Sequence, residues 1–129
     1  MTGVTILDLK DYRHLVKEIR TIDEELEWIY FPVASPNGKT SGSRGSEPSD
    51  PTARAVRKAA RLKERRARLQ AKVEAIDWWL LNLEDHQLAA ICRERYVLGK
   101  SWAEVSLDVC GSDNFSTARM IVVRHFGSA

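Results

Sequence analysis

Residues 93–105, with the sequence RERYVLGKSWAEV, contain the end of one helix, a tight turn and the start of the next helix. Gly99 suits the left-handed backbone conformation that often terminates a helix. Ser101 and Glu104 form an S-x-x-E capping box, in which each side chain bonds a backbone N–H group that the helix start leaves unpaired. A short turn of this kind between short helices predicts a helix-turn-helix unit in residues 84–129.

Three short helices are expected in this unit, over about residues 86–98, 102–109 and 113–126. Apolar residues recur three and four positions apart in the first and third of them. Gly111 marks a second stop between the second and third helices. Trp102 falls in the first turn of the second helix, where its ring can pack on the first helix.

A helical arm over residues 5–83 is expected before this unit. Apolar residues follow heptad spacing in two stretches, which predict helices over about residues 8–30 and 51–83. Residues 32–50 lie between them and are rich in proline, glycine and serine. Because such a segment buries too little apolar surface to offset its ordering entropy, we expect a flexible linker there. The fold class is therefore all-α.

The two apolar seams predict an antiparallel hairpin, in which the acidic residues 23–27 lie beside the basic start of the second helix, residues 54–61. The alternative is that each seam pairs with a second copy of the chain. We expect the arm to support a homo-oligomer, with a dimer favoured. The oligomerisation residues are assigned to both seams: Leu15, Ile19, Ile22, Leu26, Leu69, Val73, Ile76 and Leu80.

Charge is distributed unevenly along the 129 residues, whose formal net charge is +2. Residues 54–72 hold nine basic residues and one acidic residue. This run is either a phosphate-binding surface, with Arg61, Arg65 and Arg68 as its representatives, or a solvated face paired with the acidic first helix. The sequence leaves both interpretations open.

Enzymatic and metal-binding functions lack support in the sequence. Cys92 and Cys110 form no C-x-x-C pair, and the three histidines have no ligand spacing. No phosphate-binding loop, zinc-protease or nucleophile-elbow motif occurs. We expect a non-enzyme without a cofactor or metal. We also expect no membrane segment and an intracellular location, because no apolar run is long enough to span a bilayer and no signal peptide is recognisable.

The segment RERYVLGKSWAEVS resembles the region-4 helix-turn-helix of sigma-70 factors, and more closely the phage-encoded late-gene transcription regulators of the ArpU and RinA type. Arg95-Tyr96, Gly99, Ser101-Trp102 and Val105-Ser106 match the pattern of that group in place. The specific match covers about residues 84–112. The resemblance implies a sequence-specific regulator that binds double-stranded DNA in the cytoplasm of a bacterial host, with RNA polymerase as a further partner.

In a helix-turn-helix, the start of the third helix meets the base edges. This placement assigns base contacts to Asn114, Ser116, Thr117 and Arg119, and phosphate contacts to Lys100 and Ser101 at the second helix.

Two alternative functions stay open. One is a small terminase subunit that recognises viral DNA for packaging. The other is a protein–protein adaptor, which the acidic residues of this unit favour. Trp78 and Trp79 are expected to form a hinge packing site rather than a stacking platform for bases.

Overall fold

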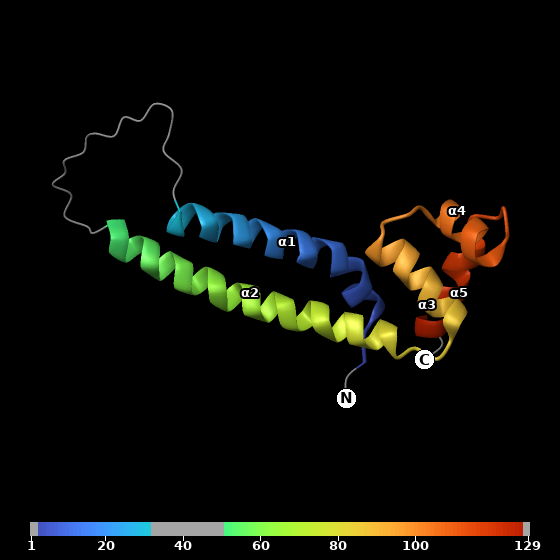
Figure 1. Ribbon diagram of the computed structural model, residues 1–129. Coiled ribbons are helices and arrows are strands. Elements are labelled where there is room, and N and C mark those ends of the chain that lie inside the picture. Colours follow the sequence, from blue (N-terminus) through green and yellow to red (C-terminus); the bar gives the residue numbers. More distant parts are fainter. Residues whose placement is uncertain (1–2, 32–50, 128–129) are drawn as a thin grey trace, which may run out of the picture.

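The computed structural model describes residues 3–31 and 51–127, and the regular structure in this part of the chain is entirely helical (Figure 1). The all-α prediction is confirmed. A long pair of helices forms the arm, and the remaining helices form a compact unit at one end of it. The predicted linker, residues 32–50, lies outside the described residues.

Two long helices make the arm: α1 spans Ile6–Tyr30 and α2 spans Pro51–Leu81. The start of α1 is fixed by a capping box between Thr5 and Asp8. At about 1.5 Å per residue, α1 is about 37 Å long and α2 about 46 Å long. Figure 1 shows them side by side and antiparallel, with the start of α1 next to the end of α2. The predicted hairpin is therefore confirmed.

The ion pair between Lys58 and Glu25 falls within the predicted ranges, whereas two further pairs between α1 and α2 use Arg65 and Arg66, which lie beyond residues 54–61. Arg65 pairs with Glu18, Arg66 Nε lies 2.5 Å from Asp23 Oδ1, and Lys58 Nζ lies 3.4 Å from Glu25 Oε2. Near the other end of the arm, the Tyr12 hydroxyl donates a hydrogen bond of 2.7 Å to Asp77 Oδ1. Burial, and then this bond, raise the pKa of Tyr12 to about 12.

The apolar seams close on each other within one chain. Six of the residues assigned to oligomerisation are buried in the core between α1 and α2, namely Ile19, Ile22, Leu69, Val73, Ile76 and Leu80. The other two, Leu15 and Leu26, are half-buried against the same core. This corrects their assignment: intramolecular packing covers these side chains, so any contact between copies has to use another surface.

The compact unit contains three short helices. The first consists of α3 (His86–Cys92) continued by the π-helical segment η1 (Arg93–Val97). The second consists of α4 (Trp102–Val105) continued by the π-helical segment η2 (Ser106–Cys110). The third, α5, spans Ser116–Gly127 and starts three residues later than the sequence pattern suggested. That delay has a local cause, because residues 112–114 form polar turns before the helix begins.

The first two helices of this unit end in the same way. Gly99 and Gly111 have φ angles of +78° and +65°, in the region that favours glycine. After each glycine, a backbone N–H reaches six residues back. Lys100 N donates to Glu94 O at 3.0 Å, and Ser112 N donates to Ser106 O at 3.1 Å. These bonds satisfy carbonyl groups that the helix ends would otherwise leave unpaired.

One apolar core runs from the arm into the compact unit. It includes Ile91, Val105 and Val122, each fully buried.

The two tryptophans near the end of α2 have different surroundings. The Trp79 ring lies against His125 and Phe126 in α5, as a hinge packing site requires, whereas Trp78 is 67% exposed and does not join that packing.

Candidate nucleic-acid interface

Ser106 joins the second and third helices of the compact unit. Its side chain is fully buried, and its hydroxyl donates to Phe115 O at 3.1 Å and accepts from Ala118 N at 3.0 Å. Ala118 lies in the first turn of α5, where backbone N–H groups lack partners within the helix. A serine in η2 therefore caps α5 from outside and sets the position of its amino-terminal end.

Three of the predicted base-reading residues take part in local hydrogen bonds at the start of α5. Asn114 Oδ1 accepts from the Ser116 backbone N at 3.0 Å and from the Ser116 hydroxyl at 2.9 Å. The Thr117 hydroxyl lies 3.0 Å from that of Ser112. The Asn114 side chain is nevertheless exposed, and its amide NH2 group is the part left to meet a base edge.

The two predicted phosphate contacts of the second helix are also engaged. Lys100 Nζ lies 3.2 Å from Asp108 Oδ2 and 3.5 Å from Glu94 Oε1. The hydrogen bond with Asp108 is the main cause that raises the pKa of Lys100. Ser101 forms the predicted capping box with Glu104. Two carboxylates thus neutralise Lys100, and a phosphate would have to displace them.

Arg119 lies apart from the other predicted readers. It lines a hollow of about 280 Å³ together with Lys10 of α1 and Arg95 of η1, and Tyr96 forms part of the same wall. Burial raises the pKa of Tyr96, and the nearby charges of Arg95 and Arg119 partly oppose that rise. The α5 arginine therefore faces the junction between the compact unit and the start of the arm.

The basic run of α2 contains both paired and unpaired cations, so it supports each of the two interpretations, a paired face and a phosphate-binding surface, in part. Arg65 is paired with Glu18, as a solvated paired face predicts. Arg61 and Arg68 have no ion pair with the described residues, and both line an open hollow on α2 with Arg57 and Lys58. Two of the three predicted arm cations are thus free to meet a phosphate.

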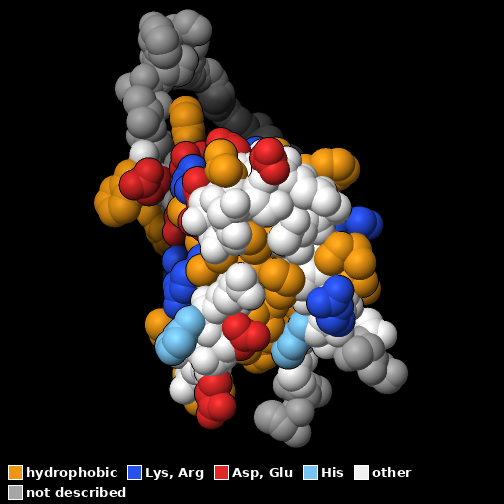
Figure 2. All heavy atoms as spheres, turned by 90° about the vertical axis from the view of Figure 1, so that its right-hand side faces the viewer, with side chains coloured by type: hydrophobic (Ala, Val, Ile, Leu, Met, Phe, Trp, Pro, Cys, Tyr) orange, Lys and Arg blue, Asp and Glu red, His pale blue; other side chains and the backbone are white. Residues whose placement is uncertain are grey.

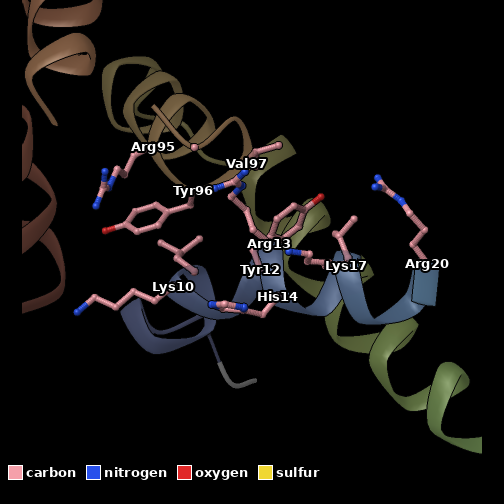
Figure 3. Close-up of a pocket in the computed structure, with 12 residues that line it drawn as sticks. Lys10, Tyr12, Arg13, His14, Lys17, Arg20, Arg95, Tyr96 and Val97 are labelled. Atoms are coloured by element: carbon pink, nitrogen blue, oxygen red, sulfur yellow. The ribbon is translucent and has the colours of Figure 1, made fainter. Parts of the chain in front are cut away.

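A second cationic surface, which the sequence reasoning missed, lies on α1. Lys10, Arg13, Lys17 and Arg20 are the only lysines and arginines among residues 3–31, and all four line one groove of about 660 Å³ (Figure 3). We call these four residues the α1 stripe. At 100° per residue they fall within an arc of about 80° on the helix. Their 3-4-3 spacing is visible in the sequence, but nothing there indicates that η1 packs beside this face of α1.

The other wall of this groove belongs to η1 and the turn that follows it. Figure 3 shows Arg95, Tyr96 and Val97 across from the α1 side chains. Arg95 Nη1 donates to Lys100 O at 2.9 Å, and its guanidinium lies 4.8 Å from the centre of the Trp102 ring. The Arg13 guanidinium lies against Gly99, so closely that a methyl group there would be 2.5 Å from Arg13 Nη1. The arm thus packs directly on the predicted turn.

The outer face of the compact unit differs from this groove. Figure 2 shows that face with hydrophobic side chains among the white backbone and uncharged side chains, and its charged groups stand singly rather than as a continuous cationic field. Leu107 and Phe115 are exposed by 59% and 62%. The cations that could neutralise phosphates are therefore concentrated at the junction with the arm and on α2.

Searches against family models, curated proteins and solved structures found no match to this chain. Among the described residues, no group of three potential metal ligands occurs. Over the same part of the chain, no helix combines the length and the apolar character that crossing a bilayer requires.

Proposed function

We propose that this chain is a sequence-specific regulator that binds double-stranded DNA through its helix-turn-helix unit. The observation that carries the proposal is the pair of turns in residues 93–118. A left-handed glycine and a capping box separate the first two helices, and Ser106 holds the start of the third. The resemblance to the phage late-gene regulators supports the same function, since it rests on residues of that first turn.

The bases would be read by two exposed side chains, Asn114 just before α5 and Arg119 on α5 beside the junction with the arm, with Asn114 available to adenine and Arg119 to guanine. The phosphate contacts would come from cations beside this helix, because Lys100 is held by two carboxylates. Association with RNA polymerase and a cytoplasmic location in a bacterial host are parts of the proposal that rest on the resemblance alone.

Fluorescence anisotropy with duplex DNA tests this proposal. The probe set is a library of labelled duplexes that tile the DNA flanking the gene, measured at about 0.05 and 0.15 M salt. We expect one or a few duplexes to bind more tightly than the others. Arg119→Ala should lower that preference by about 1–3 kcal/mol. Arg124→Ala removes the same charge from the last turn of the same helix and serves as the control. Equal binding to every duplex, or equal effects of the two variants, would contradict sequence reading by α5.

One observation favours a second candidate function, that of a protein–protein adaptor. The outer face of the compact unit carries exposed apolar side chains and lacks a cationic field (Figure 2). An adaptor would give no retained complex with any duplex at either salt concentration, so the same titration separates the two functions.

The oligomeric state separates the regulator from a small terminase subunit. We propose a dimer, and a dimer has to form through a surface other than the closed seams of the arm. Light scattering should give about twice the chain mass of 14.6 kDa. A ring of about eight or more subunits would favour the terminase.

A further inference from the structure

We propose that the α1–η1 groove, which comprises the α1 stripe and Arg95, is the main phosphate-binding surface, and that it holds the backbone of the double-stranded DNA. This inference rests on the proposed function. It adds the statement that the duplex lies across the junction of the arm and the compact unit, in contact with the first helix of the chain.

The charge in this groove is uncompensated, which is the first argument. Among residues 3–31 and 51–127, no carboxylate lies within ion-pairing distance of a stripe residue or of Arg95, and no acidic residue lines the groove. The acidic residue Glu18 instead points to α2, where it pairs with Arg65. Several acidic residues of the arm are therefore paired with basic residues of α2, whereas the cations of the α1 stripe remain exposed.

The shape of the groove is the second argument. Lys10 and Arg20 lie at opposite ends of the row of α1 side chains in Figure 3. Ten residues of helix separate them by about 15 Å. A row of that length suits a repeating anion, because successive phosphates of one DNA strand are about 3.4 Å apart along the duplex axis. A volume of 660 Å³ lies in the range of small-molecule pockets, but those are mainly apolar, whereas five of the twelve residues that line this groove are lysines or arginines.

Continuity with α5 is the third argument. The hollow that contains Arg119 shares Lys10, Arg95 and Tyr96 with the groove. A strand that follows the stripe therefore reaches the side of α5 that carries the proposed guanine reader. No comparable link joins α5 to Arg61 and Arg68, which lie on α2 in a hollow lined by α2 residues alone.

Two matched triple variants test the inference. The first is Lys10→Gln/Lys17→Gln/Arg20→Gln in the groove. The second is Arg57→Gln/Arg61→Gln/Arg68→Gln on α2. Each removes three exposed positive charges, and glutamine keeps a good helix propensity in both. Arg13 stays unchanged because it contacts the Gly99 turn. Thermal unfolding should show that both variants keep the wild-type fold.

Affinity is measured for one duplex from 0.05 to 0.3 M salt, with a duplex RNA of the same sequence as a second probe. Each lost phosphate contact lowers the slope of log K against log salt by about 0.9. The groove variant should lose up to about 2.7 units of slope and on the order of 10²-fold in affinity at 0.1 M salt. The α2 variant should lose less than about threefold.

Other results overturn the inference. Equal losses in the two variants would mean that net charge alone sets the affinity. An unchanged groove variant would place the DNA elsewhere while leaving the proposed function intact. Tighter binding of the RNA duplex would assign the groove to a different polymer. If the wild-type protein binds no duplex, the proposed function itself fails.

Discussion

Removal of the Ser106 hydroxyl should destabilise the whole molecule, because this one group makes two hydrogen bonds that link η2 to the start of α5. In Ser106→Ala, the Ala118 N–H loses its 3.0 Å partner and Phe115 O loses a donor at 3.1 Å. Ala118 and Ser106 are both fully buried, so water cannot replace the hydroxyl without rearrangement. A buried donor left unpaired costs about 1–3 kcal/mol. We therefore expect a loss of about 2 kcal/mol.

Urea unfolding followed by circular dichroism measures this loss. With a slope of about 2 kcal/mol per molar urea, the midpoint should fall by about 1 M. Thr21→Ala is the control, because Thr21 also donates its hydroxyl to a backbone carbonyl, that of Lys17, but at an exposed site. Its effect should stay within about 0.5 kcal/mol. If the two variants shift the midpoint equally, the bridging role of Ser106 is refuted.

Two further predictions concern the contacts between α1 and its neighbours. The pKa of Tyr12 is raised to about 12, so its contribution to stability is complete below the unfolded pKa of about 10 and is lost as pH rises toward about 12. Urea midpoints should therefore fall more steeply between pH 9 and 11 for the wild-type protein than for Tyr12→Phe, and parallel curves would contradict this. Gly99→Ala and Gly111→Ala both place alanine at positive φ, at a cost of about 1–2 kcal/mol, but only the former displaces Arg13. Gly99→Ala should thus be the more destabilising of the two, and Arg13→Ala should remove the excess; equal costs would argue against the Arg13 contact.

Periodicity and turn chemistry account for what the sequence could predict of this fold. The heptad spacing of residues such as Ile19 and Val73 indicated the two arm helices, and their charges indicated the hairpin. Gly99 and the Ser101–Glu104 box identified the first turn, because the cause of that turn is local.

Contacts between distant segments could not be predicted in the same way. Ser106 resembles any serine on a short helix until the position of α5 is known. The α1 stripe is visible as spacing, but its groove exists only because η1 packs beside it. The charge on Lys100 was counted as available for phosphate, whereas the fold brings Asp108 to it. In each case the partner comes from another element, which a helical period does not specify.

The hydrogen bond between Tyr12 and Asp77 limits how the two arm helices can slide past each other. Apolar heptads are nearly self-similar, so a shift of one helix by seven residues, about 10 Å, would still place aliphatic side chains against aliphatic side chains. Such a shift would leave a phenol hydroxyl and a carboxylate without each other at a partly buried site. A polar pair within a repeating apolar interface thus selects one alignment of the two helices. That alignment also sets how far the arm extends from the compact unit.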